Sequence, residues 1–162
     1  FGMDVQQLTT LYLINLILNI ALAPLLGRAV ARYGERNALV VEYFGLALVF
    51  FAYGGIYLFG WGILIAASLY ILDHLFFALA LAIKTYFQKI ADPQDIAATA
   101  AVAFTINHIA AIFLPVSLGF LWLKSPFLVF CTAGTLAIFS FVLALLIPRE
   151  PRIGKETIFC VS

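Results

Sequence analysis

Two adjacent side chains, Asp73 and His74, lie inside an otherwise apolar stretch, SLYILDHLFFALALAIK (Ser68–Lys84). A carboxyl and an imidazole at this place can bind and release a proton, and either can bind a polar solute. A charge at the centre of a bilayer costs at least about 3 kcal/mol, so such groups face protein or a water-filled cavity. The pair therefore predicts a proton or substrate pathway. The alternative is a helix-to-helix hydrogen bond from Asp73 to Asn107 or His108.

Polar side chains at a similar depth occur in two further apolar segments. Asn107 and His108 lie near the middle of one, and Tyr12, Asn15 and Asn19 lie in another. The spacing of the last three places them on one helix face. We therefore assign all five to the predicted substrate or proton pathway. The alternative for Asn15 and Asn19 is hydrogen bonding between helices.

The composition indicates what kind of element holds these groups. The 162 residues are 65% hydrophobic and 10% charged, and the mean hydropathy is +1.11. A soluble domain has about a quarter charged residues, so this chain cannot form a water-facing surface. The sequence predicts an all-α, polytopic membrane helix bundle. Basic and acidic residues nearly cancel, which gives no indication of nucleic-acid binding.

Five segments have the roughly 20 apolar residues that a transmembrane helix needs. They cover residues 8–27, 38–57, 61–90, 94–121 and 127–147. We predict a transmembrane bundle over residues 1–148 and a cytoplasmic tail over 149–162. The third segment is too long for a bilayer core at 1.5 Å per residue. We expect it to tilt or to project into the cytoplasm.

The basic residues predict the orientation, because they concentrate on the cytoplasmic side of membrane proteins. With the loop 27–37 in the cytoplasm, only Lys124 falls outside. The residues on the inner side are Arg28, Arg32, Arg36, Lys84, Lys89, Arg149, Arg152 and Lys155. The sequence thus predicts an integral protein of the cell (inner) membrane with a cytoplasmic C-terminus. Cys131 and Cys160 would then lie on opposite sides, which excludes a disulfide between them.

The loop PLLGRAVARYGERNALV (Pro24–Val40) resembles the cytoplasmic signature of the major facilitator superfamily. That signature joins the second and third helices of each six-helix half. Ala31 stands where the family has an acidic residue, and Glu35 replaces the first of two basic residues. The motif comprises Gly27, Arg28, Arg32, Gly34 and Arg36. Its arginines serve either as headgroup anchors alone or as part of a conformational latch.

The segment FTINHIAAIFLPVSLGFLW (Phe104–Trp122) also looks like the eleventh helix of that family. The resemblance implies helices eight to twelve, the C-terminal half; the alternative register is helices two to six. It further implies a partial major-facilitator fold that moves a small solute by alternating access. Its partners would be a small-molecule substrate, the lipid bilayer and the remaining helices of the same transporter. Since Phe1 is not a start methionine, we expect the chain to be part of a longer one.

Other functions compete with this one. The first alternative to a transporter is a non-transporting membrane scaffold, receptor or assembly protein with a transporter-like fold. The second alternative is an intramembrane enzyme. No serine-centred nucleophile elbow, phosphate loop or Cys/His metal spacing is found, so we expect no enzyme activity, metal or cofactor. Glu42, close to the cytoplasmic face, is expected to pair with Arg28, Arg32 or Arg36.

Overall fold

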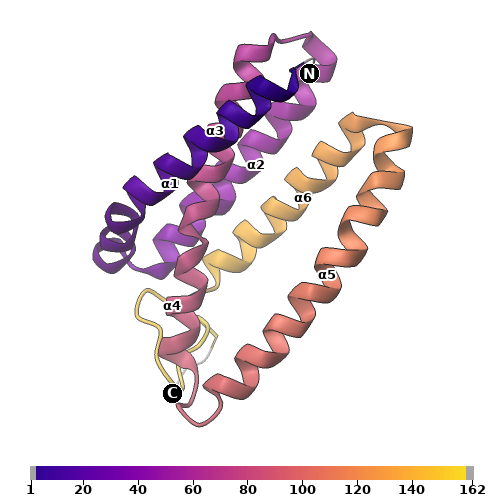
Figure 1. Ribbon diagram of the computed structural model, residues 1–162. Coiled ribbons are helices and arrows are strands. Elements are labelled where there is room, and N and C mark those ends of the chain that lie inside the picture. The colour runs from indigo at the N-terminus through magenta and orange to yellow at the C-terminus, as the bar shows by residue number, and fades with distance from the viewer. Residues whose placement is uncertain (1–2, 160–162) are drawn as a thin grey trace.

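The computed structural model describes residues 3–159 and consists of helices joined by short connections (Figure 1). Within these residues there is no strand, and an isolated bridge joins Arg152 and Lys155 in the tail. The elements are α1 (Val5–Tyr33), α2 (Glu35–Phe59), α3 (Ile63–Phe77), the 3₁₀ turn η1 (Ala78–Ala80), α4 (Leu81–Ile90), α5 (Ile96–Lys124) and α6 (Pro126–Leu145). The all-α class predicted from the sequence is confirmed.

Five helical segments of the described chain are long and apolar enough to cross a membrane, with α3, η1 and α4 together forming one of them. The predicted helix bundle is confirmed to this extent. Consecutive segments run in opposite directions, so the two ends of the chain lie at opposite ends of the bundle (Figure 1). Eight of the nine basic residues therefore belong to the end where the C-terminal tail lies, and Lys124 belongs to the other end.

The connection between α1 and α2 is much shorter than the sequence indicated. We expected a loop over residues 27–37, but α1 continues to Tyr33 and α2 begins at Glu35. Gly34 alone separates them, with a φ of 84°. Only glycine adopts this conformation without strain, so one residue reverses the chain. Gly27 and the first motif arginines are therefore helical, because nothing at those positions interrupts the hydrogen bonds of α1.

The third span is interrupted near its middle. Its α-helical hydrogen bonding changes to a 3₁₀ turn over Ala78–Ala80 and resumes at Leu81. Such a turn within a helix often marks a hinge, because its hydrogen bonds have poorer geometry. The sequence predicted one long helix here, and neither glycine nor proline marks the interruption.

Helix α2 lies at the centre of the bundle and packs against α1, α3, α4 and α6. About half of its apolar stretch is buried, far more than in any other candidate span of the described chain. Small residues permit this close packing. The ring of Phe76 covers Gly45, and the ring of Phe51 on α2 covers Gly134 of α6. Close approach at glycines is a usual way for membrane helices to associate.

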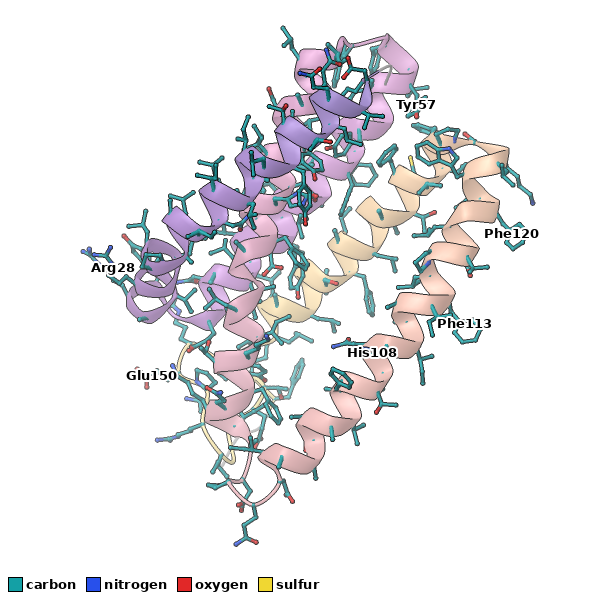
Figure 2. The ribbon with its side chains drawn as sticks, in the orientation of Figure 1. Arg28, Tyr57, His108, Phe113, Phe120 and Glu150 are labelled. Carbon is teal, nitrogen blue, oxygen red and sulfur yellow. The ribbon has the colours of Figure 1, made fainter. Side chains whose placement is uncertain are left out.

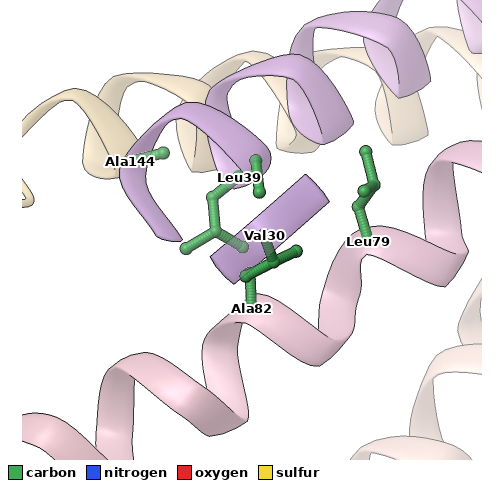
Figure 3. Packing of buried hydrophobic residues seen from close by; sticks show 6 residues of the cluster. Val30, Leu39, Leu79, Ala82 and Ala144 are labelled. Carbon is green, nitrogen blue, oxygen red and sulfur yellow. The ribbon is translucent and has the colours of Figure 1, made fainter. Parts of the chain in front are cut away.

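A second set of contacts closes the end of the bundle where the tail lies. Val30, Leu39, Leu79, Ala82 and Ala144 form one buried cluster that joins α1, α2, η1, α4 and α6 (Figure 3). The tail folds back against this end. The Tyr86 hydroxyl donates a hydrogen bond to the carbonyl of Glu156 at 2.6 Å, and the amide of Ile158 donates to the carbonyl of Leu146 at 3.0 Å.

Helix α5 lies at the edge of the bundle and packs mainly on α6 (Figure 1). None of its residues is buried, and Ala110, Leu118 and Leu121 are half-buried. Trp122 makes edge contacts with Tyr57 of α2 and Phe130 of α6. The rest of this apolar helix is free to contact lipid or further protein.

Candidate functional site

Asp73 and His74 are neighbours on α3 whose side chains approach each other, and they form an ion pair when the imidazole is protonated. The Oδ2 atom of Asp73 lies 3.4 Å from Nδ1 of His74, and the two side chains are 25% and 33% exposed. Adjacent side chains on a helix diverge by about 100°, yet these two bend toward each other. Both groups are thus partly shielded and partly open, which suits a group that exchanges a proton.

The backbone carbonyl of Tyr70 organises the polar groups around this pair. It lies 3.1 Å from Nδ1 of His74 and accepts a hydrogen bond from Nδ2 of Asn15 at 3.3 Å. A carbonyl can only accept, so Nδ1 of His74 carries the hydrogen in this contact. The Nε2 atom of His74 is then free to accept a proton or a hydrogen bond.

The three polar residues predicted on the first span have different environments. Asn15 is 3% exposed, and its bond to the carbonyl of Tyr70 joins α1 to α3. Asn19 is half-buried and donates to the carbonyl of Asn15 within α1. Tyr12 is 61% exposed and lines a pocket of about 430 Å³ with Tyr70. Asn15 therefore forms an interhelical hydrogen bond, which was the alternative stated for it in the sequence analysis. It also lies close to His74, because both side chains contact the carbonyl of Tyr70.

Tyr53 of α2 belongs to this site, although the sequence did not point to it. It is 8% exposed, interacts electrostatically with Asp73 and Tyr70, and stacks on Phe130 at 5.0 Å. The midspan polar cluster, as we name it, consists of Asn15, Tyr53, Tyr70, Asp73 and His74. In an aromatic-rich apolar stretch, the sequence does not distinguish a buried tyrosine from a lipid-facing one. The rotation of α2 about its axis, seen only in the structure, places Tyr53 in the interior.

Asn107 and His108 lie apart from this cluster. His108 is exposed, and its Nδ1 atom lies 2.9 Å from the carbonyl of Phe104 on its own helix. Asn107 is also exposed, and in the described chain no hydrogen bond joins either residue to Asp73. Figure 2 shows His108 on the side of α5 that faces the rest of the bundle, with Phe113 and Phe120 on the other side. Both residues remain predicted pathway residues.

The motif loop makes its ionic contact through a residue that departs from the family pattern. Glu35, which is 4% exposed, pairs with Lys89 of α4 at 2.7 Å. Arg28, labelled at the edge of the bundle in Figure 2, donates through Nε to the carbonyl of Pro24, and Arg32 lies over the ring of Tyr33. Arg28 and Arg32 thus make contacts with their own helix, while Glu35 and Lys89 connect α2 to α4.

The expected pairing of Glu42 with an arginine is wrong. Glu42 is 2% exposed, and its Oε2 atom has no hydrogen-bond partner. The ion pairs of the described residues are those of Asp73 and Glu35. The reason is geometric: Arg28 and Arg32 belong to the end of α1, whereas Glu42 is two turns into α2 and faces its packed interior.

Replacing Lys89 tests whether the Glu35–Lys89 pair holds α2 and α4 together. Lys89→Gln leaves a buried carboxylate unpaired, so we expect the free energy of unfolding to fall by about 1–3 kcal/mol. Glu35→Gln leaves an ammonium that is 51% exposed and can reach water, so its loss should stay below about 1 kcal/mol. Thermal unfolding in detergent micelles measures both. Lys84→Gln, an exposed change on the same helix, is the control; equal losses at Glu35 and Lys89 would contradict the asymmetry.

No group of three or more His, Cys, Asp or Glu side chains within residues 3–159 is arranged to hold a metal ion. Comparison with protein-family models, with curated proteins and with solved structures finds no match to this chain.

Proposed function

We propose that this chain is part of a secondary active transporter that moves a small solute across the membrane by alternating access and couples the movement to protons. The observation that carries the proposal is the Asp73–His74 pair, which is partly exposed in the middle of a candidate span. The pair lies one turn from Tyr70, whose carbonyl accepts a hydrogen bond from Asn15 of α1. Ionisable groups at such a depth are costly, and in transporters they mark ion and substrate pathways.

The resemblance of the motif loop to the major facilitator superfamily supports the same proposal. In this view the five spans are helices eight to twelve, and further helices of the same transporter complete the substrate cavity. The exposed residues of α5 would then contact those helices. The protein would reside in the cell (inner) membrane.

Solute-driven proton flux tests the proposed function. The full-length protein is reconstituted into vesicles that contain a pH-sensitive dye, and a panel of sugars, amino acids, organic anions and organic cations is added outside. We expect at least one class to produce a proton flux that protein-free vesicles do not show. A folded protein that produces no flux with any class would favour the scaffold, receptor or assembly function.

Thiol labelling tests the orientation. Eight of nine basic residues lie at the end of the bundle that carries the tail, so we expect that end in the cytoplasm. Cys160, which lies outside the described residues, should resist a membrane-impermeant maleimide in intact cells, in a background in which Cys131 is alanine. Lys124→Cys, at the opposite end, should label readily. Labelling of Cys160 before permeabilisation would reverse the orientation.

A further inference from the structure

The carboxyl of Glu42 is the most deeply buried ionisable group that the proposed mechanism does not use. It is 2% exposed, and with Leu39 it is one of the two largest fully buried side chains. Its Oε2 atom has no hydrogen-bond partner. A buried carboxylate without a partner costs far more than a buried neutral acid, so a carboxyl in this position holds its proton.

Glu42 lies between two buried clusters on one face of α2. Toward the tail end, Leu39 packs with Leu79 of η1 and Ala82 of α4. In the other direction, the ring of Phe76 covers Gly45. Positions three and four apart share a helix face, so the Glu42 side chain faces the region where α3 gives way to η1. The buried carboxyl therefore lies opposite the break in the third span.

The charged and titratable groups of the neighbouring elements leave this carboxyl nearly isolated. Tyr43, the next residue, interacts electrostatically with Glu42. Within the described chain, no ion pair joins Glu42 to any of the groups on the elements packed against α2. Those groups are Tyr12, Arg28, Arg32 and Tyr33 of α1, Tyr70, Asp73 and His74 of α3, Lys84, Tyr86 and Lys89 of α4, and Cys131 of α6.

From this geometry we propose that Glu42 is a second proton-binding residue of the transport cycle, distinct from Asp73, and that it senses the packing of η1 on α2. While the two are packed, Glu42 is a neutral acid. When η1 moves away and water enters, the O–H bond breaks, the proton passes to water and a hydrated carboxylate remains. The proposal rests on the proposed function only in placing this step within a transport cycle.

The position of Glu42 indicates the side to which the proton is released. Glu42 is two turns from the start of α2, at the end of the bundle that carries the tail. With that end in the cytoplasm, opening at η1 exposes the carboxyl to the inner solution. The ion pair of the buried Glu35 with the half-exposed Lys89 joins α2 to α4, the helix that follows η1, so it would separate in the same movement.

Infrared spectroscopy of the full-length protein in vesicles measures the protonation directly. We expect the carbonyl-stretching band of a protonated carboxylic acid at neutral pH, and we expect Glu42→Gln to remove it. Asp73→Asn is the matched control and should leave this Glu42 component in place. A band unchanged by Glu42→Gln would overturn the proposal. Should that variant not fold, Glu42→Met, of similar volume, replaces it, and failure of both to fold would show that Glu42 is structural instead.

Cysteine accessibility at Leu79→Cys, with the native cysteines replaced, tests the link to η1. Leu79 is 9% exposed. The relative rate is the rate of its reaction with a small maleimide divided by the rate in the unfolded protein at the same pH. We expect this relative rate to rise at least about tenfold as the pH is raised and Glu42 ionises. In the Glu42→Gln background the relative rate should stay low at every pH. An equal rise in both backgrounds would contradict the proposal.

These results separate the role of Glu42 from the proposed function. If Glu42→Gln loses the infrared band and the parent protein shows no proton flux with any solute, Glu42 is a proton-binding switch in a protein that is not a transporter. Flux that depends on Asp73 together with an unchanged band in Glu42→Gln would leave the transporter and remove the role of Glu42.

Discussion

Asp73→Asn will abolish solute-driven proton flux in the reconstituted full-length protein and leave the protein folded. Asparagine keeps the shape of the side chain and can bond to His74, whose Nδ1 lies 3.4 Å from the carboxylate. It cannot bind and release a proton. A step that needs the charge to change therefore stops, and we expect the flux to fall more than tenfold, to the level of protein-free vesicles. Dye fluorescence from about pH 6 to about pH 8 measures the flux.

Two controls test whether the loss of flux is specific to Asp73 and not due to unfolding. Asp95→Asn removes an exposed carboxylate that precedes α5 and should leave the flux unchanged. Thermal unfolding of Asp73→Asn should match the parent protein. Normal flux across the pH range would show that Asp73 is a hydrogen-bonding group without a coupling role. An unfolded variant would show that Asp73 holds helices together.

Gly45→Val will destabilise the bundle more than valine at any other helical glycine of the described chain. A Cβ atom at Gly45 would lie 2.5 Å from the ring of Phe76, closer than non-bonded atoms approach. Valine adds two further methyl groups at the centre of the bundle. Overpacking of a core costs about 1–3 kcal/mol, and we expect a loss at the upper end of this range. Thermal unfolding in detergent micelles gives the midpoint for comparison with the parent protein.

Gly119→Val is the matched control, because a Cβ atom at Gly119 meets nothing within 4 Å. Both glycines lie within helices, so the change of helix propensity is the same at both. The double variant Gly45→Val with Phe76→Leu should lose less stability than the sum of its single changes, since the shorter side chain relieves the contact. Equal losses at Gly45 and Gly119 would show that the contact with Phe76 does not determine the stability.

The two predictions concern the same helix pair. Asp73 and Phe76 are three residues apart on α3, and α2 faces them with Tyr53 and Gly45 respectively. The polar site and the tightest packing of the bundle are therefore neighbours along one interface. If α3 moves against α2 during transport, both sets of contacts must change together.

Much of the fold follows from the sequence. Hydropathy over about 20 residues is a local property, so the five spans were predicted close to their observed ends, except that the first continues to Tyr33 instead of ending at residue 27. For Asn15 the sequence left two roles open, a pathway role and an interhelical hydrogen bond. A polar residue at midspan needs a hydrogen-bond partner, but its residue type does not indicate which group that partner is. The same limit applies to Asp73, whose closest charged group is the adjacent His74.

The sequence did not predict two features, the continuation of α1 beyond residue 27 and the 3₁₀ turn in the third span. The glycine and arginine pattern of residues 27–37 suggested a long loop, yet α1 continues to Tyr33 because helical hydrogen bonds persist where no residue prevents them. The 3₁₀ turn at Ala78–Ala80 carries only alanine and leucine, residues that also form regular helices. Leu79 of this turn packs in a buried cluster with Leu39 of α2, a contact that no local pattern records.

The sequence by itself determined the number of apolar helices, their approximate ends and the depth of their polar residues, because each of these depends on residues that are neighbours along the chain. The tertiary structure decided which faces meet. It buried Glu42 without a partner, paired Glu35 with Lys89, placed Tyr53 beside Asp73 and left His108 exposed. These outcomes depend on the rotation of each helix about its axis. In a chain that is apolar on nearly every face, that rotation is set by the close fit of small and large side chains between helices.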